Sequence, residues 1–313
     1  MANHQASHAA DSQLPSRDHP ATLLPSAALT HGPDWRHRLL ARYFAAREHP
    51  GRLRIIGILR RTLGVSLVRK QVSDGVVMEL DPGDYLQREI LVRGSYEGAT
   101  LRLLDNLIIN AGGFLDVGAH MGLFTLRAAH ALAKRGGRVV AIEPTPAHAA
   151  MLLRNAELSG LANIDLISCA LSDFRSLVTM ASPHHANTGG SRIKEENGPD
   201  FRSIPIRVSV VPAGDVVPLL PPRALDVVKV DVEGHEFRVL RSLLGSMKDL
   251  PANIIVEYVP EQRRYEGDLA WISELGYEIL EVDGRQYLGT RPPLEDNLWL
   301  RLRAKTAGAF PTR

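Results

Sequence analysis

The sequence FLDVGAHMGLFTL, residues 114–126, changes abruptly from apolar residues to an aspartate and glycines. Its first residues have the apolar character of a buried strand, but Asp116, Gly118 and Gly122 interrupt the run. The pattern predicts a strand that ends near Asp116, a glycine turn, and a helix that begins near Met121. Taken alone, it fits two alternatives: a loop that lets a ligand approach the backbone, or a tight strand-to-helix turn that needs glycine.

The rest of the chain continues this alternation of strand and helix. Strands are expected at FLDVG, RVVAIEP, IDLISCAL, LDVVKVD and NIIVEYV, and helices at 121–134, 146–158, 235–244 and 262–275. Continuous apolar strands separated by helices indicate a doubly wound parallel α/β sheet. The last two strands, YEILEV and LWLRLR, have only a turn-like linker between them, so we expect an antiparallel hairpin at one side of the sheet. An ordinary dinucleotide-binding fold would add another helical crossover there.

Polar residues also follow the next two strands. Glu143 ends VVAIEP, and Ser172 and Asp173 end CALSD. Because ligands of such sheets bind beyond the carboxyl ends of the strands, these side chains are expected at one site. A carboxylate after the second strand accepts hydrogen bonds from ribose hydroxyls, and Ser172 and Asp173 would lie beside an adenine amino group. The sequence therefore predicts an adenosine-containing ligand, with Asp173 as a simple turn residue being the alternative.

The glycine spacing bears on which adenosine ligand this is. Asp-x-Gly-x-x-x-Gly differs from the Gly-x-Gly-x-x-Gly of dinucleotide sites, which cradles a pyrophosphate. S-adenosylmethionine has no pyrophosphate, and its ammonium group suits Asp116, directly or through its backbone and a water. The spacing and the terminal hairpin favour S-adenosylmethionine, and an NAD-dependent oxidoreductase is the less favoured alternative.

A second interruption occurs in VVKVDVEGHEFRVL, residues 227–240. Asp231 lies at the end of a strand, next to the expected cofactor pocket, and His235 and Glu236 begin a helix. Acids at a helix N-terminus are stabilised by the helix dipole, which explains Glu233 and Glu236 structurally. Asp231 has no such explanation and is a candidate for chemistry.

In order along the chain, GSYEGAT, FLDVGAHMG, VVAIEP, CALSD, LDVVKVDVEGHEFRVLRSLL and NIIVEY resemble the motifs of FkbM-type methyltransferases. The resemblance covers about residues 75–303, and Asp-Val-Glu-Gly-x-Glu is its most specific part. It implies a class I S-adenosylmethionine-dependent methyltransferase fold with seven strands in the order 3-2-1-4-5-7-6. It also implies methylation of a hydroxyl oxygen, on a sugar or a secondary-metabolite scaffold. One departure is His120, where the family more often has Asn; His120 is still expected among the cofactor contacts.

A hydroxyl acceptor needs a base, because an aliphatic hydroxyl is a poor nucleophile. Asp231 and His235 are the favoured candidates, with Glu257, at the end of the fifth strand, orienting the acceptor. His184 and His185 lie in a long irregular segment that would either form a lid with a catalytic histidine or remain a solvated loop. A metal-assisted route stays open as a variant, because Asp231 and Glu257 offer oxygen ligands to a divalent ion. The sequence shows no third ligand at a convincing spacing, so no metal site is predicted.

Composition and the chain ends limit the remaining alternatives. A net charge of +2 gives no sign of nucleic-acid binding, and the lone Cys169 excludes an internal disulfide framework. Nothing resembles a signal peptide or a membrane span, so a soluble cytoplasmic protein is expected.

We expect a disordered tail at 1–33, a basic helical extension at 34–74, a methyltransferase domain at 75–305, and a tail at 306–313. The extension is either a solvated helical cap or a contact surface for an anionic partner such as a membrane. A non-catalytic scaffold that keeps the fold is a further alternative to an enzyme.

Overall fold

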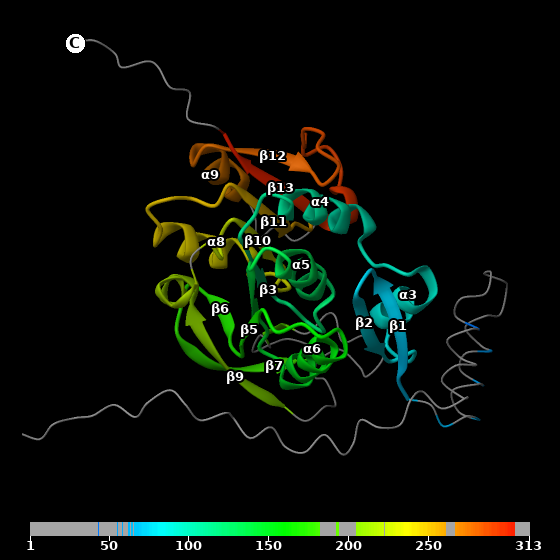
Figure 1. Cartoon of the computed structure of the whole chain (residues 1–313). Helices are drawn as coiled ribbons and strands as arrows, with labels where there is room; N and C mark the ends of the chain where they lie inside the picture. Colours follow the sequence, from blue (N-terminus) through cyan, green and yellow to red (C-terminus); the bar gives the residue numbers. More distant parts are fainter. Residues whose placement is uncertain are drawn as a thin grey trace, which may run out of the picture.

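The computed structural model describes residues 66–181, 192–193, 205–221, 223–260 and 267–303, with five isolated residues between positions 43 and 64. A seven-stranded sheet forms the centre of the described chain (Figure 1). Its strands are β3 (Gly113–Val117), β4 (Arg138–Ile142), β5 (Ile164–Ile167), β10 (Val227–Val230), β11 (Asn253–Glu257), β12 (Tyr277–Glu281) and β13 (Asn297–Leu302). The expected tails and the segment with His184 and His185 lie outside the described residues.

The strand order of this sheet is β12-β13-β11-β10-β3-β4-β5. Numbered along the chain and read from β5, it is 3-2-1-4-5-7-6, which confirms the order that the family resemblance implied. β3, β4, β5, β10 and β11 are parallel, whereas β13 runs antiparallel to both β11 and β12. The terminal hairpin is therefore confirmed, with β13 inserted between its hairpin partner and the parallel part of the sheet.

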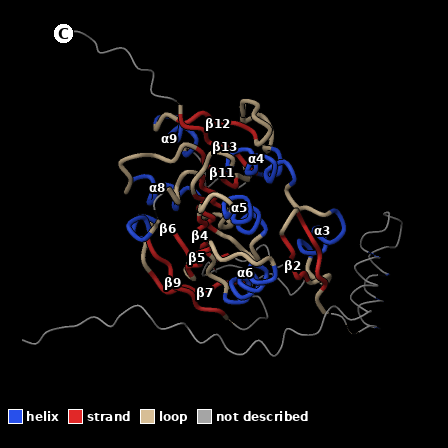
Figure 2. The backbone as a smooth tube through the Cα atoms, in the orientation of Figure 1, coloured by secondary structure: helices blue, strands red, loops and turns tan. Residues whose placement is uncertain are grey.

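Helices cover both faces of the sheet (Figure 2). The main ones are α4 (Gly98–Ile108), α5 (Leu123–Ala133), α6 (Pro146–Leu158), α8 (Glu236–Gly245) and α9 (Asp268–Glu274). Successive side chains of each strand pack into opposite layers: Phe114 belongs to the core under α4 and α5, and Leu115 to the core under α8. Because both faces are covered, the central strands are apolar along their whole length, as the sequence analysis expects.

An antiparallel hairpin precedes this sheet. β1 (Val68–Ser73) pairs with β2 (Val76–Leu80), and α3 (Tyr85–Arg93) follows them. β2 contacts α5 and α6, so the hairpin packs against the helical layer and its apolar residues are buried there. The helical extension predicted up to residue 74 is wrong over Val68–Ser73, because these residues find strand partners in β2. Most of residues 34–65 lie outside the described part of the chain, and the predicted contact with an anionic partner stays a prediction.

A second, smaller sheet has the order β6-β9-β7-β8. Its strands are β6 (Ala170–Ser172), β7 (Ser176–Ala181), β8 (Arg192–Ile193) and β9 (Ile206–Pro212), and β9 leads into α7 (Ala213–Val216) and a 3-10 turn (Val217–Leu219). We expected IDLISCAL to be one strand and the following residues to be irregular. Instead the chain leaves the main sheet after Ile167, since β6 finds its partner in β9. In the described ranges, no helix is long and apolar enough to cross a membrane.

Candidate active site

The two interrupted strands lie side by side at the centre of the sheet. β3 and β10 are parallel neighbours, and the amide of Asp231 donates to the carbonyl oxygen of Val117 across 2.9 Å. Gly118 follows with φ +87°, and a Cβ atom at this position would lie 1.7 Å from the carbonyl oxygen of Asp231. Glycine is therefore required here both by its backbone conformation and by the close approach of the second strand end.

A cavity of about 330 Å³ opens at this edge of the sheet. The ends of β3, β4, β10 and β11 line it, together with β6, β7, α3 and the segment before α4. Its size falls in the range of about 300 to 1,000 Å³ that is usual for small-molecule sites. Five of the predicted site residues line this cavity: Gly118, His120, Glu143, Asp231 and Glu257.

Glu143 lies at the end of β4 with only 4% of its surface exposed. Its Oε2 accepts from the amide of His120 and its Oε1 from the amide of Thr145, both across 2.8 Å, and His148 Nδ1 lies 3.5 Å from Oε1. Burial opposes ionisation, but the His148 ring and the Thr145 amide hold the pKa of Glu143 below its usual value. Each carboxylate oxygen has two lone pairs, so an ionised Glu143 retains acceptor capacity for ribose hydroxyls.

Thr145 adds an unsatisfied group next to Glu143. Its Oγ1 is buried without a hydrogen-bond partner among the described residues, and the residue lines the cavity. A buried hydroxyl left unpaired costs about 1–3 kcal/mol, which a polar ligand group would recover. Gly118, Glu143 and Thr145 thus fit the adenosine part of S-adenosylmethionine: the glycine admits the ligand to the backbone, and the two side chains offer polar partners.

His120 is held in the left-handed conformation, with φ +51°, between the two glycines of the loop. Asn, Asp and His are several-fold enriched in this region of backbone space, so His can replace the Asn that the family favours. The His120 ring packs on His148, with centroids 3.9 Å apart. Burial, and next the His148 ring, lower the pKa of His120 to about 4, so the ring is neutral near pH 7 and a weak base.

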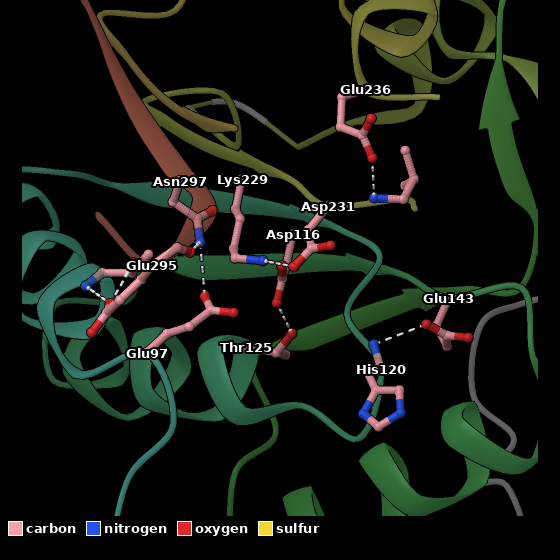
Figure 3. A network of polar contacts seen from close by, with 12 residues as sticks. Glu97, Asp116, His120, Thr125, Glu143, Lys229, Asp231, Glu236, Glu295 and Asn297 are labelled. Carbon is pink, nitrogen blue, oxygen red and sulfur yellow. Dashed lines mark hydrogen bonds and ion pairs between the residues drawn. The ribbon is translucent and has the colours of Figure 1, made fainter. Parts of the chain in front are cut away.

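Asp116 does not face the cavity. The side chain is 1% exposed, and its Oδ2 accepts from Thr125 Oγ1 on α5 across 2.5 Å (Figure 3). Burial raises the pKa of Asp116 to about 6, although Lys229 and Thr125 oppose this shift. The Asp116 carboxylate does not reach the cavity directly, because the side chain points into the packing between β3 and α5. A contact with the ligand's ammonium group through the Asp116 backbone and a water stays a prediction. Gly122 is also outside the cavity lining: a Cβ there would lie 3.0 Å from Leu152 Cγ on α6, so it serves helix packing.

The structure does not bring Ser172 and Asp173 to the cavity lining, and the adenine contacts predicted for them stay a prediction. Ser172 is fully buried, with its Oγ 3.2 Å from His235 Nδ1, and Asp173 Oδ1 lies 3.5 Å from Arg238 Nη1. Neither residue lines the cavity, because the chain turns into the second sheet after β5. Cys169, Ala170 and Leu171 line that wall instead, and give it an apolar surface.

His235 lies outside the cavity lining. It precedes α8, whereas Asp231, Val232 and Glu233 line the cavity. Two consecutive left-handed residues, Glu233 at φ +56° and Gly234 at φ +104°, turn the chain between Asp231 and His235. The base role of His235 stays a prediction, and Asp231 and Glu257 are the two catalytic candidates that line the cavity.

Carboxylates gather at the end of the cavity formed by β10 and β11. Asp231, Glu233 and Glu257 each offer an oxygen within 4.8 Å of the others, and Glu97 lines the same cavity. Glu233 is the third oxygen donor that the sequence analysis did not find, because it was explained as a helix-dipole residue. Burial, and next the charge of Asp231, raise the pKa of Glu257 to about 11, so this carboxyl is protonated near pH 7. The spacing by itself assigns no metal to these residues.

Lys229 is the main residue of this region that the sequence analysis missed. It lies in the middle of β10, is 2% exposed, and donates from Nζ to Asp231 Oδ2 across 2.6 Å (Figure 3). Burial lowers the pKa of this lysine, but Asp231, Glu97 and Asp116 together raise it above its ordinary value. The available signal was a lysine inside the otherwise apolar string VVKV, since a charged residue in a strand covered on both faces needs a charged partner.

Comparisons with known proteins bear on this site. The family model of the methyltransferase FkbM domain matches residues 116–279, more than half of the chain. Methyltransferase 1 of Beauveria bassiana (strain ARSEF 2860) is 27% identical over 214 residues, which span 62% of this chain and 82% of that protein.

Two solved structures resemble the chain distantly. The structure of M. jannaschii TYW2 in complex with AdoMet has 15% identity and a TM-score of 0.39, covering 75% of this chain and 83% of that one. An O-methyltransferase from Bacillus cereus in complex with SAH has 14% identity and a TM-score of 0.37, covering 66% and 80%. The extent of the family match is decisive: this chain belongs to the FkbM family of methyltransferases, with the class I fold and the S-adenosylmethionine cofactor expected from its sequence.

Proposed function

We propose that this protein transfers a methyl group from S-adenosylmethionine to a hydroxyl oxygen of a sugar or a secondary-metabolite scaffold. The observation that supports this most is the composition of one cavity. Glu143, with acceptor capacity for a ribose, lines it after β4, and the carboxyl groups of Asp231 and Glu257 line it after β10 and β11. A donor and a hydroxyl acceptor would then meet in the same enclosed space.

Several described residues have a defined part in this proposal. S-adenosylmethionine supplies an electrophilic methyl group when bound, and holding the acceptor oxygen in line with it accounts for much of the acceleration. Asp231, fixed by Lys229, and the protonated Glu257 offer hydrogen bonds that orient the acceptor. Gly118 and Glu143 would bind S-adenosylmethionine, and a non-catalytic scaffold would not need such a binding site.

Thermal unfolding of the whole chain with S-adenosylhomocysteine or NAD separates the classes. A ligand at 100 times its dissociation constant stabilises a protein by about 2.7 kcal/mol. We expect S-adenosylhomocysteine to raise the midpoint and NAD to leave it unchanged. Stabilisation by NAD alone would support an oxidoreductase, and stabilisation by neither would support a scaffold. A screen of glycans and hydroxylated metabolites with methyl-labelled S-adenosylmethionine then tests the acceptor; label only on nitrogen or carbon would contradict the hydroxyl.

A further inference from the structure

Glu97 begins helix α4 but does not cap it. It occupies the N-cap position in the left-handed conformation, φ +51° and ψ +56°, and its side chain makes no hydrogen bond to the first turn. Glu295, in the 3-10 turn Leu294–Asp296, supplies the cap. The Glu295 carboxylate accepts from the amides of Ala99 and Thr100 and from Thr100 Oγ1, across 2.9–3.0 Å. A polar residue at the N-cap position often accepts hydrogen bonds from the amides of the first turn. Because Glu295 accepts them here, the Glu97 carboxylate takes no part in capping.

The carboxylate of Glu97 is instead directed to the cavity, which it lines together with Asp231 and Glu257. Asn297, at the start of β13 and 1% exposed, donates from Nδ2 to Glu97 Oε2 across 3.1 Å and to the carbonyl oxygen of Glu295 across 2.7 Å (Figure 3). One buried amide therefore holds both the Glu97 side chain and the turn that caps the helix. No described residue donates a hydrogen bond to the other oxygen of Glu97, Oε1.

A non-glycine residue in the left-handed conformation costs of order 1–3 kcal/mol, and such residues concentrate at functional sites. At position 97 this conformation is held by residues near the other end of the chain: Asn297 contacts the Glu97 side chain, and Glu295 caps the helix that follows. The result is a carboxylate with a fixed orientation and one oxygen available to a ligand. That arrangement is what a group needs in order to act on a bound substrate.

Burial and nearby charges give Glu97 a different proton affinity from Glu257. Burial raises the pKa of Glu97 to about 7; Lys229 opposes this shift, and Asp231 and Glu295 add to it. Asp231 Oδ2 is already engaged by Lys229 Nζ across 2.6 Å, and Glu257 is protonated near pH 7 because burial raises its pKa to about 11. A general base works best when its pKa lies near the working pH, and Glu97 meets that condition whereas Glu257 does not.

We propose that Glu97 is the general base of the methyl transfer, and this rests on the function proposed above. The acceptor oxygen forms a bond to the methyl carbon as the bond from that carbon to sulfur breaks. The electron pair of the broken bond stays on sulfur, which becomes a neutral thioether. The hydroxyl proton passes to Glu97 Oε1 and from there to water. Asp231 and Glu257 then serve to position the acceptor.

A second role is open to a carboxylate at this place: binding the α-ammonium group at the methionine end of the cofactor. Two cofactor analogues distinguish the roles without an acceptor. S-adenosylhomocysteine and sinefungin share the α-ammonium, but sinefungin carries an additional charged amine in place of the methylated sulfonium. A base that lies next to the reacting methyl group contacts the additional amine, whereas an ammonium-binding carboxylate contacts the group that both analogues share.

The experiment is calorimetric titration of the full chain with both analogues at pH 8, for wild type, Glu97→Gln and the surface control Glu278→Gln. Glu278 pairs with Arg301 outside the cavity. We expect wild type and the control to prefer sinefungin by about tenfold or more, as for other close charge pairs. Glu97→Gln should lose this preference while its affinity for S-adenosylhomocysteine stays within about twofold. Urea unfolding of each variant verifies that it is folded.

Two results would overturn the assignment of Glu97. A parallel loss of affinity for both analogues in Glu97→Gln would show that it binds the α-ammonium, and an unchanged preference for sinefungin would place the base elsewhere. If wild type binds neither analogue, the proposed methyl transfer itself fails, and the role of Glu97 fails with it. That outcome is distinct, because it is seen before any variant is compared.

Discussion

Lys229 Nζ and Asp231 Oδ2 lie 2.6 Å apart at the carboxyl end of β10, where one side chain is buried and the other reaches the cavity. The two residues are only two positions apart, and side chains at this spacing on a strand point to the same side, which lets them pair. Its environment is not local, since Asp116 on β3 and Glu97 before α4 also act on the lysine. The ammonium group is thus the counter-charge for carboxylates from three segments.

Removing this counter-charge should destabilise the fold. Lys229→Met leaves Asp116, Asp231 and Glu97 without a nearby cation, and breaking a buried pair costs about 3–5 kcal/mol. The loss should be smaller at pH 5 than at pH 8, because burial raises the pKa of Asp116 to about 6 and that of Glu97 to about 7, so both are protonated at pH 5. Urea unfolding at both pH values measures the change, with the exposed Lys134→Met as a control within about 0.5 kcal/mol of wild type. An equal loss at both pH values would show that packing, and not charge, is responsible.

Gly118→Ala should be among the most damaging small substitutions in the chain. The new Cβ would lie 1.7 Å from the backbone oxygen of Asp231, so β3 and β10 must separate. Gly136→Ala is the matched control, because it also has positive φ but has nothing within 4 Å of the new Cβ. The control should lose only the conformational cost of about 1–2 kcal/mol. Similar unfolding free energies for the two variants would contradict the steric role of Gly118.

Glu143→Ala should weaken binding of S-adenosylhomocysteine by at least about tenfold, because a hydrogen bond to a charged group contributes about 1.5–3 kcal/mol. The 2′-deoxyribose analogue separates this from general damage. Wild type should bind the analogue more weakly than S-adenosylhomocysteine, and Glu143→Ala should bind both alike. Calorimetry measures the four affinities, and a variant that still discriminates the two ligands would refute the ribose role.

Two substitutions of His120 test whether its left-handed backbone conformation or its ring contact with His148 matters more for stability. His120→Asn and His120→Ala both remove the contact with His148, but Asn tolerates the left-handed region much better than Ala. We expect His120→Asn to be more stable than His120→Ala by about 1 kcal/mol in urea unfolding. Equal stability of the two variants would mean that the ring, and not the φ angle, determines the residue at this position.

Glu257 should make stability depend on pH. Its pKa is raised in the folded state from 4.5 to about 11, so its contribution is fully present below pH 4.5 and declines as the pH rises towards 11. Glu257→Gln stays neutral throughout, so its stability relative to wild type should increase from pH 5 to pH 9. Urea unfolding at pH 5, 7 and 9 measures this difference. A difference that does not change with pH would show that Glu257 is ionised in the folded protein.

Local patterns were sufficient to predict much of the fold. Apolar strands with helical segments between them predicted the parallel sheet, and the linker without a helix predicted the β12–β13 hairpin. Helix α6 begins at the predicted Pro146 and ends at Leu158, because proline at the first position and the glycine after the helix are local signals. The small second sheet was missed, since its strands are short and pair with partners far along the chain.

The sequence by itself determined which residues stand at strand ends: Gly118, Glu143, Asp231 and Glu257 were all predicted from their own strands, and all line the cavity. Only the tertiary structure decided which way the other polar side chains point. Asp116 faces Thr125, Ser172 and His235 face each other, and Glu97 is turned to the cavity because Glu295, almost two hundred residues later, caps its helix. A side chain's position along a strand follows from backbone periodicity, whereas its partners depend on contacts between segments that no local pattern records.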